Sequence, residues 1–167
     1  DYLWVSLRNQ LARLPVNDDN TLGELEIYLD ELPYNGRSNG TLAVVDDRLF
    51  YQTSGRLRDG KPVEGSGILW VLDSAESDPT LFASGLKHAY AMVSAENGQL
   101  WTVDIHDGSV ENEVMPDEVN LIAQGDHLGW PTCYAQGKVA QKYGGSDALC
   151  AATVPAHVVF PPHATPT

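Results

Sequence analysis

The chain has 167 residues, of which 43% are apolar and 20% charged, a composition typical of a folded domain. Its formal net charge of −13 argues against nucleic acid and against anionic membrane surfaces as partners. No apolar run approaches the roughly 18 residues that a membrane span requires. A solvated acidic face accounts for the charge, and calcium binding by some of the carboxylates is the alternative explanation.

Short alternating or apolar runs, separated by turn residues, predict β-strands along the whole chain. At 24–32 the composition would suit a helix, but the period-two alternation favours a strand. No segment predicts a helix. The expected strands are 3–7, 10–14, 24–32, 41–45, 48–53, 68–72, 81–84, 90–94, 100–103, 118–122 and 157–160. The predicted fold class is therefore all-β.

The segment 81–131 is the most informative part of the chain. The sequence Glu96-Asn97-Gly98 predicts a tight hairpin turn, because Asn and Gly accept the positive φ that such a turn requires. A polar stretch over 104–115 separates the last two strands of the segment. We expect the segment to form one antiparallel sheet with a long loop at one end, where functional residues are often found.

Weak internal repeats recur at a spacing near 50 residues. Residues 42–53 resemble 92–103, with Leu49 and Leu100 aligned at a spacing of 51. Repeats of this length with four short strands are typical of β-propeller blades, whereas a β-sandwich would give short strands without a phased repeat. We therefore predict a β-propeller, of which this chain would supply about three blades. Because the chain begins inside a strand-like run, we expect 1–167 to be a single partial domain of a longer protein.

The two cysteines, Cys133 and Cys150, flank a polar loop that contains several glycines. A disulfide between them would stabilise the fold by about 3 kcal/mol through loop closure. From the spacing alone, this disulfide and a pair of separate buried thiols are both open.

Four motifs, in a fixed order, resemble the glucose/sorbosone dehydrogenase family of soluble sugar dehydrogenases that depend on pyrroloquinoline quinone (PQQ). They are Ala83-Ser84-Gly85-Leu86-Lys87-His88-Ala89, Leu100-Trp101, Asp117-Glu118-Val119-Asn120-Leu121-Ile122 and Leu128-Gly129-Trp130-Pro131. The segment from Cys133 to His163 resembles the sorbosone-type branch, in which two cysteines bracket this loop, and this likeness favours the disulfide. The resemblance implies a six-bladed β-propeller, periplasmic or secreted, that binds PQQ and calcium at the mouth of its central channel.

The resemblance also implies hydride transfer from a CH–OH group of a sugar or polyol to the quinone, with a histidine as general base. The position of that histidine corresponds here to Arg37, or to Ser38 if the loop shifts, and neither is a histidine. An arginine stays protonated and cannot act as a base. Arg37, Lys87 and His88 are the predicted PQQ-binding residues, with Lys87 neutralising a quinone carboxylate. The backbone carbonyls of His106 and Asp107 are the predicted calcium ligands.

Three functions remain open on the sequence. In a dehydrogenase, the base would be His88, His163 or a residue elsewhere in the protein, and Arg37 would orient the substrate or the quinone. The alternative is a non-catalytic secreted propeller that binds a ligand or protein at the same mouth, which the missing histidine favours. A calcium-dependent hydrolytic propeller would need converging carboxylates, for which the sequence offers Asp104 and Asp107.

Several of these motifs also have purely structural interpretations. Asp117 and Glu118 would begin a strand and satisfy neighbouring backbone groups, and Trp130 would pack between blades. His88 would be a hydrogen-bonded turn residue. The sequence Asn39-Gly40-Thr41 fits the N-glycosylation pattern.

Overall fold

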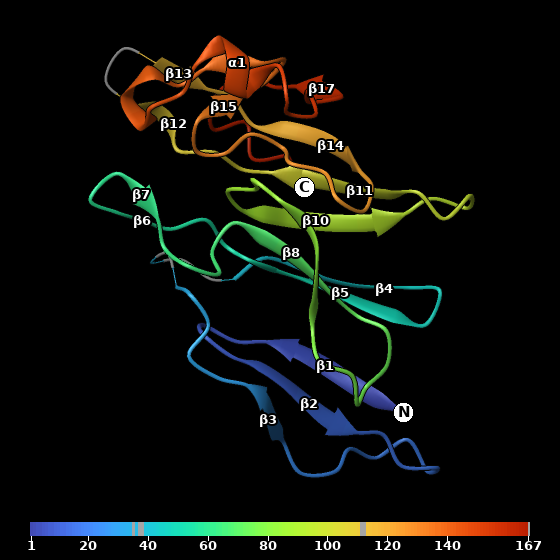
Figure 1. Ribbon diagram of the computed structural model, residues 1–167. Helices are drawn as coiled ribbons and strands as arrows, with labels where there is room; N and C mark the ends of the chain where they lie inside the picture. The colour runs from blue at the N-terminus through green and yellow to red at the C-terminus, as the bar shows by residue number, and fades with distance from the viewer. Residues whose placement is uncertain (35, 37–38, 111–112, 167) are drawn as a thin grey trace.

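The computed structural model describes residues 1–34, 36, 39–110 and 113–166. In this part of the chain, three antiparallel sheets of three or four strands follow one another and stack as successive layers (Figure 1). Sheet I is β1 (Tyr2–Ser6), β2 (Leu11–Pro15) and β3 (Glu26–Leu29). Sheet II is β4 (Leu42–Val45), β5 (Arg48–Thr53), β8 (Ile68–Leu72) and β9 (Thr80–Ser84). Sheet III is β10 (Ala89–Ser94), β11 (Leu100–Asp104), β14 (Glu118–Ile122) and β17 (Val158–Val159).

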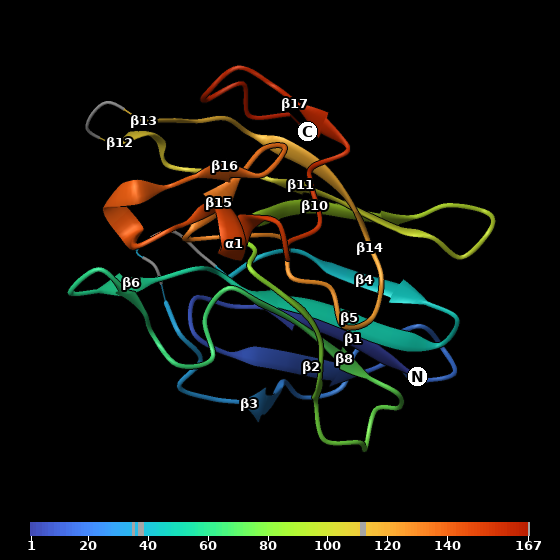
Figure 2. The same ribbon diagram turned by 45° about the horizontal axis from the view of Figure 1, so that its top comes forward.

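The connections between these strands carry short elements of their own. They are β6 (Leu57–Arg58), β7 (Lys61–Pro62), β12 (Gly108–Val110), β13 (Glu113–Met115), β15 (Cys133–Tyr134), β16 (Lys138–Val139), the 3₁₀ helix η1 (Gln141–Tyr143) and α1 (Asp147–Cys150). The β6–β7 and β12–β13 hairpins extend from one end of the stacked sheets, and the β4–β5 and β10–β11 turns lie at the other (Figures 1 and 2). We call the first of these the loop end.

Strand β5 is the most deeply buried strand because sheet II lies between the other two sheets. Alternate side chains of a strand point to opposite faces. Phe50 therefore packs into the cluster shared with sheet III, whereas Leu49 and Tyr51 pack into the cluster shared with sheet I. Burial on both faces explains why three consecutive residues of this strand, Leu49, Phe50 and Tyr51, are apolar.

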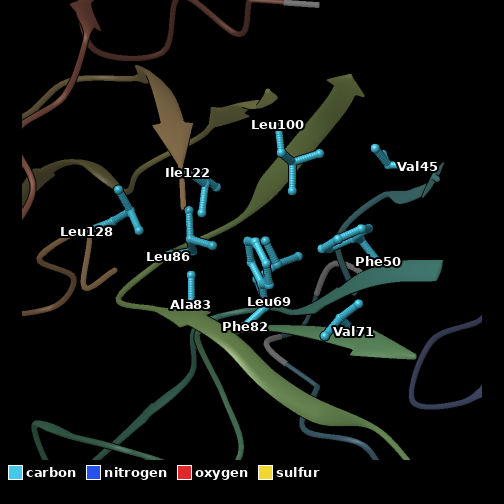
Figure 3. Packing of buried hydrophobic residues seen from close by; sticks show 10 residues of the cluster. All are labelled: Val45, Phe50, Leu69, Val71, Phe82, Ala83, Leu86, Leu100, Ile122 and Leu128. Carbon is cyan, nitrogen blue, oxygen red and sulfur yellow. The ribbon is translucent and has the colours of Figure 1, made fainter. Parts of the chain in front are cut away.

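The interface between sheets II and III forms the larger hydrophobic core (Figure 3). The rings of Phe50 and Phe82 meet edge to face with centroids 4.9 Å apart, a favoured geometry for aromatic pairs. Leu100 and Ile122 close the cluster from sheet III, as Figure 3 shows. This core therefore fixes the position of sheet II relative to sheet III.

The all-β prediction is confirmed, and most expected strands lie within two residues of their predicted bounds. The prediction that 81–131 forms one sheet is wrong, because β9 pairs with β8 and closes sheet II, while the later strands form sheet III. The chain crosses between the sheets at Gly85, which has φ +78° and whose Cβ would lie 2.2 Å from His127 Nδ1. Only glycine fits this crossing. The alternation of β9 and β10 alone could not reveal that they belong to different layers.

The prediction that the chain contains no helix is also wrong. Helix α1 begins after Ser146, whose hydroxyl accepts a hydrogen bond from the Leu149 N–H at 3.3 Å. The disulfide between Cys133 and Cys150 is confirmed, and it ties α1 to β15. A helix of four residues is too short to give a periodic signal. Neither helix in the described ranges has the length and apolar character of a transmembrane helix.

Candidate functional site

Asp104, at the end of β11, organises the crossing between sheets II and III. Its carboxylate accepts hydrogen bonds from two consecutive backbone N–H groups, Lys87 at 2.8 Å and His88. The Ile105 N–H returns a hydrogen bond to the His88 carbonyl at 2.9 Å. Because Asp104 is 1% exposed, these contacts are shielded from water and fix the backbone that carries Lys87 and His88.

The Lys87 side chain lies between a carboxylate and an aromatic ring. Its Nζ is 3.1 Å from Asp107 Oδ2 and 5.5 Å from the centre of the Trp130 ring. Trp130 in turn packs against Gly55 and Gly67, where an added Cβ would lie 2.8 Å and 2.7 Å from the ring. This confirms Trp130 as a packing residue. The ring and the carboxylate hold the ammonium group in one place, and its three N–H donors allow it to bind a further acceptor.

His88 is 7% exposed and belongs to a chain of polar side chains. Its Nδ1 is 2.7 Å from the Ser54 hydroxyl, which lies 3.4 Å from Gln52 Oε1. The Ala89 N–H donates to the same Gln52 oxygen at 3.2 Å, and this fixes the orientation of the amide. The prediction that His88 is a hydrogen-bonded turn residue is confirmed. The contact between Nδ1 and Ser54 also fixes the orientation of the imidazole ring.

A pocket of about 250 Å³ lies where the first strands of the three sheets approach one another. Its lining residues are Ser6, Asn39, Gly40, Thr41, His88, Ala89 and Tyr90. Asn39 Oδ1 accepts the Ser54 N–H at 3.2 Å. Its Nδ2 and Gln52 Nε2 are buried donors without an acceptor among the described residues, and each such group costs about 1–3 kcal/mol if left unpaired. At 6% exposure, Asn39 is not an accessible glycosylation site.

His106 lies between two buried carboxylates, Asp104 and Glu118. Its Nε2 is 3.5 Å from Asp104 Oδ2 and 3.6 Å from Glu118 Oε2, and neither ring nitrogen has a hydrogen bond of normal length within the described ranges. Burial raises the pKa of Asp104 to about 6. Burial alone would lower the pKa of His106, but contact with Glu118 and the charges of Asp104, Glu118 and Asp107 outweigh it and raise that pKa to about 9.

Asp117 connects this cluster to the C-terminal segment. Its carboxylate accepts the His106 N–H at 3.1 Å and the Thr165 N–H at 2.8 Å. Glu118 accepts the Ala135 N–H. The prediction that both carboxylates satisfy neighbouring backbone groups is confirmed, and through them the loop after β11 is held from two sides.

The calcium prediction can be compared with the donors that the loop presents. In the described part of the chain, no three His, Cys, Asp or Glu side chains form a metal cage. The carbonyl oxygens of His106 and Asp107 accept no hydrogen bond from described residues, so both are available to a hard cation. Any calcium at this position would therefore be held by backbone oxygens, because the described side chains form no cluster that could hold a metal ion. For the hydrolytic propeller, the required set of converging carboxylates is absent from the described residues.

The structure brings four of the predicted site residues together: Lys87, His88, His106 and Asp107 all lie within one or two contacts of Asp104. Arg37 falls outside the described residues. His163 is exposed on the segment after β17, and its role as the base stays a prediction.

Sequence reasoning missed the supporting residues Asn39, Gln52 and Ser54. One signal was present, because Gln52 directly follows the apolar residues Leu49, Phe50 and Tyr51 in β5, and the structure shows that it has no exposed surface. A polar side chain in a strand buried on both faces needs hydrogen-bond partners. Its partners come from Ser54 and from the start of β10, and no pattern within β5 could show which they are.

The stacked antiparallel sheets, with their polar loop end, define a fold of the β-propeller type. Solved structures of PQQ-dependent sugar dehydrogenases share this fold. The PQQ-bound aldose sugar dehydrogenase from Streptomyces coelicolor matches with a TM-score of 0.70 and 15% identity over 96% of this chain and 48% of that chain. The holo form of the pyranose dehydrogenase PQQ domain from Coprinopsis cinerea matches with a TM-score of 0.75 and 12% identity over 98% and 52%.

The apo form of the soluble aldose sugar dehydrogenase from Escherichia coli gives a TM-score of 0.66 and 16% identity over 92% of this chain and 49% of that chain. No family model and no curated protein matches the sequence. The chain thus spans about half the length of the structures that it resembles. At these identities the likeness confirms the fold predicted from the motifs.

Proposed function

We propose that the protein is a PQQ-dependent dehydrogenase that oxidises a CH–OH group of a sugar or polyol. The observation that carries this proposal is the double hydrogen bond from Lys87 and His88 to Asp104. It presents the two predicted quinone contacts side by side, at the loop end of a fold shared with PQQ-bound sugar dehydrogenases.

When bound, PQQ would supply the acceptor for the hydride. Lys87 is the cation suited to a quinone carboxylate, and Arg37 is the second. His88 would contact the quinone or serve as the base that takes the hydroxyl proton. Calcium would rest on the carbonyls of His106 and Asp107, where two oxygen acceptors are available.

The whole protein is proposed to be a longer propeller, in which residues 1–167 form a partial domain of about three blades from the sorbosone-type branch. A periplasmic or secreted location agrees with the disulfide, because disulfides persist in oxidising compartments. The small-molecule partner would be a sugar or polyol.

A second candidate is a non-catalytic secreted propeller that binds a ligand or a protein at the same loop end. The observation that favours it is the arginine at position 37, where the resembling family has its base. In this case His88 would have a structural role only, consistent with its burial and with its bond to Ser54.

The test is a dye-coupled oxidation assay on the purified full-length protein, with PQQ and calcium added and glucose, sorbitol and sorbosone as substrates. The dehydrogenase predicts calcium-dependent PQQ binding and reduction of the quinone by at least one of these substrates. Binding of PQQ without reduction by any substrate would support the non-catalytic propeller, and absence of PQQ binding would reject the dehydrogenase.

A further inference from the structure

A second pocket lies between sheets II and III, at the end of the stacked sheets opposite the loop end. It has a volume of about 330 Å³ and is bounded by the β4–β5 and β10–β11 turns (Figures 1 and 2). The two turns come close here, because Asp46 Oδ2 lies 3.7 Å from the position that a Cβ at Gly98 would take. We call this the turn-end pocket. Its walls are apolar side chains of both sheets: Val45, Phe50, Phe82, Leu100, Leu121 and Ile122.

The walls of the turn-end pocket belong largely to the core between sheets II and III. Figure 3 shows Val45 and Phe50 of sheet II beside Leu100 of sheet III. The volume of about 330 Å³ lies at the lower end of the roughly 300–1,000 Å³ that small-molecule sites occupy. An apolar group that enters the pocket leaves water and buries apolar surface, which is favourable in proportion to the area buried.

Arg48 brings a positive charge to this apolar pocket. It is half-buried, and its guanidinium carbon lies 5.3 Å from the centre of the Phe50 ring. Contact with the aromatic face positions the cation, and its five N–H donors remain available to an acceptor. Asp46 and Asp47 precede it in the β4–β5 turn, yet Arg48 forms no ion pair and no side-chain hydrogen bond with them or with any other residue in the described ranges.

Gln99 offers a second donor, whose direction follows from the β10–β11 turn. The Gln99 N–H donates to Asn97 Oδ1 at 3.2 Å, so a backbone donor fixes the orientation of the Asn97 amide. Asn97 Nδ2 then donates to Gln99 Oε1 at 2.8 Å, because an amide nitrogen donates and an amide oxygen accepts. Gln99 Nε2 is therefore the end of the amide that can donate to a ligand in the pocket.

These donors and walls define the class of ligand. A guanidinium group matches a carboxylate with paired, parallel N–H···O bonds, and the charges of the two groups balance. A phosphate monoester such as phosphoserine carries about −1.5 to −2 near pH 7 and would leave excess negative charge in a protein of net charge −13. A carboxylate with an apolar body satisfies both the guanidinium and the apolar walls.

We propose that the turn-end pocket binds a small amphiphilic monocarboxylate, with its carboxylate on Arg48 and its apolar body between the two sheets. Gln99 Nε2 is the second donor to the carboxylate. This site lies at the opposite end of the sheets from the proposed quinone site. Binding there does not require PQQ, so the failure of either proposal leaves the other standing.

The first test is NMR titration of the purified full-length protein with decanoate, below its micelle concentration, and with 2-naphthoate. These are a linear and an aromatic member of the same class. At least one of them should shift the amide signals of Gly98 and Gln99, whereas decyltrimethylammonium, with the same chain and the opposite charge, should not. No shift at these amides with either carboxylate, or an equal response to the cationic amphiphile, would overturn the proposal, and no variant has to fold for this measurement.

The second test compares the affinity of the bound carboxylate between variants. Arg48→Gln removes the charge and should weaken binding about tenfold or more. Arg58→Gln makes the same change of net charge on the exposed β6–β7 hairpin at the loop end, and it should leave the affinity unchanged. Equal affinities of Arg48→Gln and wild type would contradict the proposal. Displacement of bound PQQ by the carboxylate would also contradict it, because the ligand would then occupy the loop end.

Discussion

His106 is the single residue whose charge state most affects the loop after β11. Its pKa is raised to about 9 by the neighbouring carboxylates, against about 6.5 in the unfolded chain. A histidine whose pKa is higher in the folded state stabilises the fold fully below pH 6.5, and this contribution is lost as the pH rises through 9. Asp104 titrates near pH 6 in the folded state, so its effect lies mainly below this window.

We therefore predict that the free energy of unfolding of the wild type falls between pH 6.5 and pH 9 relative to that of His106→Gln. Urea unfolding of both proteins at several pH values, in the presence of a chelator, measures the difference. A difference between the two proteins that stays constant over this range would show that His106 is not held protonated by its neighbours.

Asp117 stabilises the fold through hydrogen bonds. Its carboxylate accepts one from a backbone N–H group in each of two separate segments. Asp117→Ala would leave the buried His106 N–H and the part-buried Thr165 N–H without this acceptor, and hydrogen bonds to charged groups contribute about 1.5–3 kcal/mol each. We predict a loss of about 2–4 kcal/mol in the free energy of unfolding, measured by urea denaturation. Asp126→Ala is the control, because the carboxylate that it removes accepts the Ala123 N–H in an exposed hydrogen bond, and it should cost about 1 kcal/mol or less.

At the scale of elements, β5 carries the packing between two sheets. Phe50 is 1% exposed and meets Phe82 edge to face. Replacing a buried phenylalanine by alanine removes its transfer free energy and leaves a cavity. We predict that Phe50→Ala lowers the free energy of unfolding by about 3–5 kcal/mol. Val44→Ala, at a site that is 63% exposed, is the matched control on the neighbouring strand, and a loss equal to that of Phe50→Ala would contradict the assignment of the core.

The disulfide also constrains secondary-structure elements, because it joins β15 to α1 across a sequence separation of 17 residues. Loop closure of this length contributes about 3 kcal/mol. We predict that the double variant Cys133→Ala/Cys150→Ala loses about this amount, by urea denaturation under oxidising conditions. Under reducing conditions the wild type should lose the same amount. A wild type that is insensitive to reductant would indicate that the loop is held by packing instead.

The elements were largely predictable because their signals are local. Alternation located β5, β8 and β14 at their observed bounds, and Asn97-Gly98 identified the β10–β11 turn. Which sheet a strand joins depends on contacts across the layers, and this is why β9 was placed with the wrong partners. The site residues likewise divide into those that a local motif identifies and those that only the three-dimensional fold brings close. The motifs located Lys87 and His88, but Asp104, Ser54 and Asn39 reach them from distant segments.

At the scale of the whole molecule, sheet I has an outer face that nothing in the described residues covers. Leu3, Leu25 and Ile27 are between 45% and 51% exposed on it. Apolar patches of this kind mark surfaces that bind a partner or promote aggregation. We predict that residues 1–167 expressed alone self-associate, as measured by light scattering coupled to gel filtration, and that Leu3→Ser/Ile27→Ser reduces this association. A monodisperse, cooperatively melting monomer would contradict the proposal that further blades cover this face.

The measurement that tests the central claim most directly is the affinity of the purified full-length protein for PQQ, compared between wild type, Lys87→Gln and Lys61→Gln. The Lys87 backbone is held beside that of His88 by Asp104, and its side chain contacts Asp107 and Trp130, so loss of its charge should weaken binding about tenfold or more. Lys61 is exposed on the β6–β7 hairpin, and Lys61→Gln makes the same change of net charge without affecting the site. The account predicts that only Lys87→Gln loses affinity. Equal affinities in all three proteins, or no PQQ binding by the wild type, would contradict it.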